Sequence, residues 1–80
     1  MLRAPEPLNA QEHRELALEL RSTDKRLREL CNMVVGVYGA ESRVGFSFMR
    51  ATESIERLRR EMQVQAVLDC PEIASERLYM

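Results

Sequence analysis

Two series of apolar residues, each spaced by alternating steps of three and four, constrain the fold of this chain most strongly. The first series contains Leu16, Leu20, Leu27, Leu30, Val34 and Val37. The second contains Val44, Phe48, Ala51, Ile55, Leu58 and Met62. Because this spacing places each series on one side of an α-helix, the sequence predicts two amphipathic helices.

Capping residues predict where these helices begin and end. Asn9 is a favourable N-cap, and Glu12, three residues later, completes a capping box, so the first helix should begin at Ala10 and extend at least to Leu30. Gly39 offers a C-terminal stop and Ser42 a second N-cap. The second helix should then run from about residue 43 to 68, and the two similar lengths favour an antiparallel hairpin.

The segment around the expected bend also permits a different fold. Residues 33–38 and 44–48 are rich in β-forming residues and glycine, which is compatible with two short strands and an α-β-β-α chain. An isolated two-stranded hairpin is only marginally stable, however, and the helical spacing continues into both segments. We therefore prefer the all-α hairpin.

The two ends of the chain should lie outside the hairpin. Prolines in residues 1–9 predict a loosely ordered, extended lead, and residues 10–69 form the hairpin. Pro71 should end the second helix, so residues 70–80 should form a short third helix, over about 71–78, or a tail.

The apolar residues near the bend are too widely distributed for one partner helix to cover. Asn32 is the one polar side chain between Leu30 and Tyr38, and the other side chains there point in every direction. A helix that is apolar all round is covered on all sides, and the simplest cover is a second copy that completes a homodimeric four-helix bundle. The predicted core and interface residues are Leu16, Leu20, Leu27, Leu30, Met33, Val34, Val37, Phe46, Phe48, Met49, Ile55, Leu58 and Met62.

Polar residues supply few candidates for chemistry. His13, the only histidine, is a weak candidate for a phosphoacceptor, and we expect it to be partly buried or to act as a capping residue. The Glu-x-x-His motif of carboxylate-bridged metal sites in bundles is not present, because Ala10 stands where its glutamate would be. We therefore expect no catalytic residue, metal or cofactor. Asp24 and Arg28, four residues apart, should form an ion pair opposite the apolar series.

Charge does not favour a nucleic-acid partner. The net charge of the 80 residues is −1, which gives no long-range attraction to phosphates. Arg57, Arg59 and Arg60 are the candidate phosphate contacts, but the acidic residues Glu53, Glu56 and Glu61 are interspersed with them.

Three features predict a cytoplasmic protein with no membrane partner. The N-terminus has no apolar segment typical of a secretory signal. The longest weakly charged stretch is interrupted by Glu41 and Arg43. Cys31 and Cys70 should lie roughly 30 Å apart along the hairpin, too far for a disulfide within the chain.

These observations predict a non-enzymatic module for oligomerisation or protein–protein interaction, with an adaptor or scaffold role. The first alternative is a small accessory or chaperone-like subunit that docks its apolar bend on a different protein. A further alternative is a regulatory bundle that binds nucleic acid.

Overall fold

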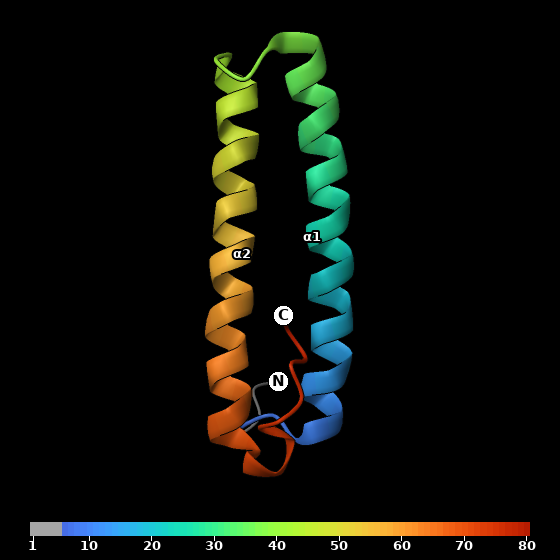
Figure 1. Ribbon diagram of the computed structural model, residues 1–80, viewed down its shortest axis with the longest axis vertical. Coiled ribbons are helices and arrows are strands. Elements are labelled where there is room, and N and C mark those ends of the chain that lie inside the picture. Colours follow the sequence, from blue (N-terminus) through green and yellow to red (C-terminus); the bar gives the residue numbers. More distant parts are fainter. Residues whose placement is uncertain (1–5) are drawn as a thin grey trace.

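The computed structural model describes residues 6–80, which form two long helices and one short helical turn. Helix α1 spans Ala10–Tyr38, helix α2 spans Arg43–Asp69, and the 3-10 helix η1 spans Pro71–Ile73. The two long helices lie side by side and antiparallel (Figure 1), which confirms the predicted all-α hairpin. The described residues contain no strand, and the two segments of the α-β-β-α alternative lie within α1 and α2.

The predicted capping residues begin both helices. The Asn9 side chain accepts a hydrogen bond from the Glu12 amide at 2.8 Å, and the Glu12 carboxylate accepts one from the Asn9 amide at 3.0 Å. Ser42 Oγ accepts from the Gly45 amide at 3.0 Å and donates to the Gly39 carbonyl at 2.7 Å. Both N-caps satisfy backbone amides that have no partner within the first helical turn.

Two glycines make the bend possible. Gly39 ends α1 with a φ of +92°, a backbone conformation that residues other than glycine rarely adopt. Gly45, in the first turn of α2, is packed so closely that a Cβ atom would lie 2.3 Å from the Gly39 carbonyl oxygen. The chain can therefore reverse direction within four residues.

The line of contact between the helices is shifted from the predicted apolar series. It is formed by His13, Ala17, Leu20, Asp24, Leu27, Cys31 and Val34 of α1 and by Gly45, Phe48, Thr52, Ile55, Arg59, Met62 and Ala66 of α2. Every second position of this contact line lies one residue later in the sequence than the corresponding position of the predicted apolar series. These shifted positions carry small or polar side chains. Small residues such as Ala17 and Ala66 let the helices approach closely, and larger neighbours such as Leu16 and Leu58 lie beside the contact line.

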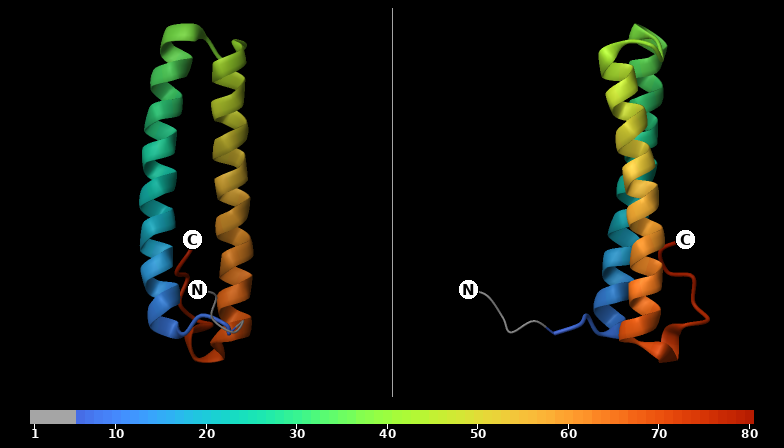
Figure 2. Two further views of the ribbon diagram at one scale, coloured as in Figure 1. Left: turned by 180° about the vertical axis from the view of Figure 1, so that it is seen from behind. Right: turned by 90° about the vertical axis from the view of Figure 1, so that its left-hand side faces the viewer.

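The C-terminal segment, residues 70–80, runs back along one side of the hairpin (Figures 1 and 2). Of the two predicted alternatives, a short third helix over residues 71–78 or a tail, the helix does not extend beyond one 3-10 turn, Pro71–Ile73. Turns after Ile73 fold the chain back so that both Ile73 and Tyr79 are buried against the long helices. Side chains of α2 replace some of the backbone hydrogen bonds that a third helix would have made, since Arg59 and Gln63 donate to backbone carbonyls of this segment.

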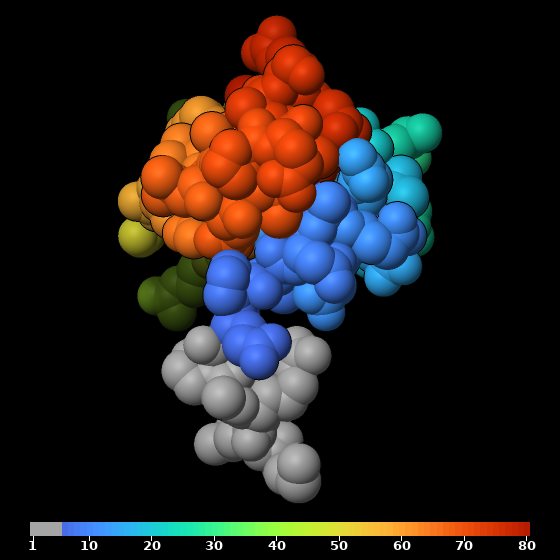
Figure 3. Space-filling model, turned by 90° about the horizontal axis from the view of Figure 1, so that it is seen from below, coloured from blue at the N-terminus to red at the C-terminus, as the bar shows by residue number. Residues whose placement is uncertain are grey.

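The apolar core is confined to the end of the hairpin opposite the bend. It consists of Ala17, Ala66, Cys70, Ile73 and Tyr79, with Ala10, Leu16, Leu20, Met62 and Leu78 packed against it. Figure 3, which views this end, shows the C-terminal residues packed beside the first turns of α1. Near the bend the hairpin is a single layer of two helices.

The N-terminal lead, the two cysteines and the apolar stretches can also be compared with the predictions. The predicted lead covers residues 1–9, of which residues 1–5 lie outside the described part and residues 6–9 are not helical. Cys31 and Cys70 are both buried and unpaired. No helix within residues 6–80 contains a stretch long and apolar enough to cross a membrane.

Candidate functional site

His13 is fully buried and joins all three parts of the fold. Its Nε2 atom lies 2.9 Å from Asp69 Oδ2 of α2, and its Nδ1 atom lies 2.8 Å from the Tyr79 hydroxyl. A neutral imidazole protonated at Nε2 satisfies both contacts, since it donates to Asp69 and accepts from Tyr79. The imidazole also meets the Tyr79 ring edge-on, with centroids 5.9 Å apart. The expected buried position is therefore observed, and His13 has no exposed nitrogen.

The same contacts affect two other titratable groups. Hydrogen bonds from His13 and Gln65 lower the pKa of the Asp69 carboxyl below its ordinary value. Burial raises the pKa of the Tyr79 phenol, and the nearby Asp69 carboxylate adds to that shift.

A second buried network centres on Asp24, which is 1% exposed. Arg28 donates to its carboxylate at 2.7 Å, and Arg59 of α2 donates to its other oxygen. Burial opposes ionisation of Asp24, but hydrogen bonds from Arg59 and Arg28 outweigh it and hold the pKa of the carboxyl below its usual value. The predicted pair of Asp24 with Arg28 forms, but at the helix contact and not opposite it as expected.

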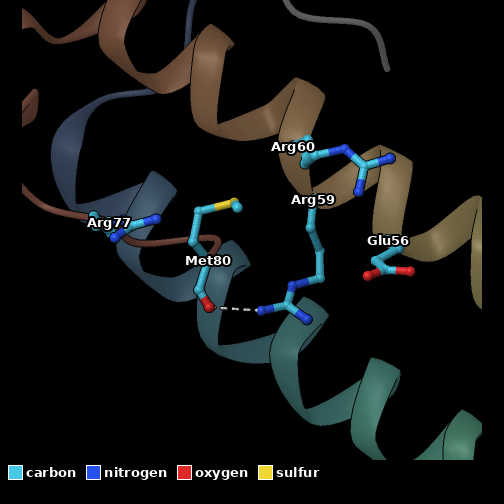
Figure 4. A pocket seen from close by; sticks show the side chains of 5 residues that line it. All are labelled: Glu56, Arg59, Arg60, Arg77 and Met80. Carbon is cyan, nitrogen blue, oxygen red and sulfur yellow. Dashed lines mark hydrogen bonds between the residues drawn. The ribbon is translucent and has the colours of Figure 1, made fainter.

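Arg59 extends this network to the C-terminal segment. Its Nε atom donates to the Tyr79 carbonyl oxygen at 2.7 Å, and its Nη2 atom donates to the Met80 carbonyl oxygen at 2.8 Å (the second bond is drawn in Figure 4). Gln63 donates to the Glu76 carbonyl at 3.0 Å and accepts from the Tyr79 amide at 3.1 Å. The C-terminal segment is thus held by side chains of α2 on one face of the hairpin, which we call the covered face.

The opposite side of the hairpin, which we call the open face, carries most of the predicted apolar series. A groove between the helices there is lined by Leu27, Ser47, Phe48 and Ala51. From this groove and the helical spacing, we assign to the open face Leu16, Leu20, Thr23, Leu27, Leu30, Met33, Val34 and Val37 of α1 and Val44, Ser47, Phe48, Ala51, Ile55, Leu58, Met62 and Gln65 of α2.

Much apolar surface of the open face is accessible. Val37 is 71% exposed, and Met33, Val44 and Leu58 are also exposed. Leu27, Phe48 and Ile55 of the contact line, and Leu30 beside it, are half-buried, so part of each side chain is in solvent. The open face is therefore an apolar surface that extends along both helices.

All but two of the predicted core and interface residues belong to the open face. Phe46 and Met49 lie near the bend on the other side of the hairpin. Phe46 precedes Arg60 by two heptads and Met49 precedes Glu56 by one, and both Arg60 and Glu56 belong to the covered face. Tyr38, one heptad after Cys31 of the contact line, is also exposed near the bend, at 66%. We call Tyr38, Phe46 and Met49 the bend patch, which the C-terminal segment does not reach. The Arg50 guanidinium lies 5.9 Å from the centre of the Phe46 ring.

Of the three candidate arginines, Arg57 does not share a site with Arg59 and Arg60. Arg57 occupies the outer edge of α2, whereas Arg60 lines a pocket with Glu56, Arg59, Arg77 and Met80 (Figure 4). The side chains of Arg60 and Arg77 lie on opposite sides of Met80 in this view, and Arg59 is turned toward Met80. These arginines therefore do not converge on one anion. Among residues 6–80, no group of histidine, cysteine, aspartate and glutamate is arranged to hold a metal.

Sequence reasoning missed the role of Asp24, Arg59, Gln63 and Tyr79 in holding the C-terminal segment. One signal was present, since Asp24 and Arg59 interrupt otherwise apolar or small positions of the heptads. Comparison with protein-family models, curated proteins and solved structures finds no match for this chain.

Proposed function

We propose that this chain is a non-enzymatic module whose function is self-association. Two copies pack their open faces together and form a homodimeric four-helix bundle, which serves as an adaptor or scaffold in the cytoplasm. The observation that carries the proposal is the open face itself, an apolar surface on both helices on which Met33, Val37, Val44 and Leu58 are exposed. Exposed apolar patches of this kind are typical of protein–protein contacts.

The size of the open face supports a stable dimer. Helix α2 has 27 residues, which gives a length of roughly 40 Å at about 1.5 Å per residue. Two adjacent helices are about 20 Å wide. The face therefore covers roughly 800 Å², the area that each partner contributes to a standard protein–protein interface.

Two further observations support the proposed non-enzymatic role and the proposed cytoplasmic location. His13 uses both ring nitrogens to hold Asp69 and Tyr79, which supports a structural role for this histidine. Cys31 and Cys70 are unpaired thiols, which are typical of proteins in a reducing compartment.

A pair of matched variants tests the proposal. Val37 lies on the open face and Leu18 lies on the outer side of α1, and both are mostly exposed in the single hairpin, at 71% and 62%. Val37→Asp should convert the dimer to a monomer, because a charge would be buried in the interface. Leu18→Asp should leave the mass in solution unchanged. Light scattering gives the mass and circular dichroism the helical content, and equal masses for the two variants would contradict the proposal.

The bend patch favours a second candidate function, that of an accessory subunit that docks on a different protein. Phe46 and Met49 of this patch lie outside the open face and would remain exposed in the dimer. Phe46→Ser should then abolish capture of a specific protein by the immobilised dimer without altering the dimer's mass. If wild type and variant capture the same proteins, this candidate fails.

A further inference from the structure

Both edges of the open face are charged, and the two edges differ in sign. The outer edge on α1, which we call the α1 rim, carries Glu15, Glu19, Arg26 and Glu29. The outer edge on α2, the α2 rim, carries Arg43, Arg50, Arg57 and Glu61. The α1 rim is therefore acidic, and the α2 rim is basic.

Two hairpins related by a twofold axis can pack these faces with aligned helices in two ways. In the same-end arrangement, both bends lie at one end and α1 of each copy lies across α2 of the other. In the opposite-end arrangement, the bends lie at opposite ends and each helix lies across its own counterpart. From the rims we propose that the chain forms the same-end dimer, an inference that rests on the proposed self-association.

The rims favour the same-end arrangement, because each acidic rim then faces a basic rim. Contacts within the hairpin fix the heights: Asp24 is level with Arg59, and Arg28 is level with Glu56. Glu29 of one copy thus lies at a height between Arg50 and Arg57 of the other. Arg26, which pairs with Glu29 at 3.7 Å within its own helix, lies level with Arg57, so the favourable contact between the rims at this height is that of Glu29. In the opposite-end arrangement, acidic rims face each other and basic rims face each other, which charge repulsion disfavours. Such complementary charges fix orientation more than affinity.

The distribution of apolar side chains gives the same orientation independently. The half of the open face near the bend consists of Leu27, Leu30, Met33, Val34, Val37, Val44, Phe48, Ala51 and Ile55, with Ser47 as its polar member. The other half includes Thr23 and Gln65. The same-end dimer places the more apolar halves against each other, whereas the opposite-end dimer would bury them against the mixed halves.

A distance between two spin labels separates the arrangements. Ala40 lies in the bend and is exposed, so a label at Ala40→Cys reports the distance between bends; the buried thiols are removed as Cys31→Ala and Cys70→Ala. The same-end dimer should give a distance below about 25 Å, because neighbouring helices in a bundle lie 8–10 Å apart. The opposite-end dimer should give about 40 Å, the length of α1.

Each outcome has a distinct meaning. A short distance that disappears when labelled protein is diluted with excess unlabelled protein supports the same-end dimer. A distance near 40 Å overturns this inference and leaves self-association intact. A monomeric mass without dipolar coupling between labels overturns both proposals.

Charge reversal provides a test without labels. Arg50→Glu with Arg57→Glu makes the α2 rim acidic and should weaken the same-end dimer about tenfold at low salt. Adding Glu19→Arg and Glu29→Arg should restore the affinity to near wild type. In an opposite-end dimer the first pair of changes leaves like charges facing like charges, so an unchanged dissociation constant would overturn the inference.

Discussion

His13 and Asp24 occupy heptad positions at the contact between the helices, where apolar side chains are usual. Each is buried, and each finds its partners on the other helix or on the C-terminal segment. Burial of polar groups is costly unless they are hydrogen-bonded, so these residues specify which segments meet. The sequence alone could not reveal these pairings, because Tyr79 lies 66 residues from His13 along the chain.

Removal of one hydroxyl tests the His13 network. Tyr79→Phe leaves His13 Nδ1 buried without a hydrogen-bond donor, and we expect the free energy of unfolding to fall by about 1–3 kcal/mol. Tyr38→Phe, at an exposed position, is the matched control and should have little effect. Urea unfolding followed by circular dichroism measures both variants, and equal stabilities would show that the Tyr79 hydroxyl does not contribute.

The stability of the hairpin should depend on pH through the carboxyl groups of Asp24 and Asp69, one in each of the two buried networks. The pKa values of Asp24 and Asp69 are lower in the folded chain than their ordinary value of 3.8. The unfolded chain therefore takes up protons more readily, and the free energy of unfolding should fall as the pH drops below about 4. Unfolding in urea at pH 7, 4 and 3 measures this fall.

A carboxyl-to-amide variant tests whether Asp69 contributes to the loss of stability at low pH. Asp69→Asn can still accept from His13 but cannot be protonated, so its stability should decline less steeply toward low pH than that of the wild type. Glu53→Gln, at an exposed position of α2, is the control and should follow the wild type. Identical slopes for all three proteins would mean that Asp69 does not contribute to the acid sensitivity.

At the scale of the elements, local signals predicted the helices well and the contact between them less well. Asn9, Gly39 and Ser42 act within a few residues, so their roles could be read from the sequence. The contact line depends on which side of each apolar stripe faces the other helix. Ala17 and Cys31 occupy it in place of Leu16 and Leu30, and local sequence does not distinguish these choices. The C-terminal segment depends on distant partners, which is why its fold was not predicted.

The bend gives an element-scale prediction with a matched pair of variants. Gly45→Ala should destabilise the hairpin, because the new Cβ atom would lie 2.3 Å from the Gly39 carbonyl oxygen. Gly36→Ala has open space around it and should stabilise α1 by up to about 1 kcal/mol. Thermal unfolding of both variants measures the difference, and an equal response would contradict the close packing of the bend.

At the scale of the whole molecule, the hairpin is built unevenly. The C-terminal segment provides a second layer at one end, where the small core lies. Near the bend the two helices have no second layer, and apolar side chains are exposed on both faces. The open face places these side chains where a second hairpin would cover them, so we expect the cooperative unit of folding to be the dimer.

Sedimentation equilibrium of the purified wild-type chain over a range of concentrations tests the proposed self-association most directly. The monomer has a mass of 9.3 kDa. We expect a mass twice that of the monomer at micromolar concentration, with no larger species as the concentration rises. A folded helical chain that keeps the monomer mass at the highest concentration would contradict the proposal that the open face is an interface between copies.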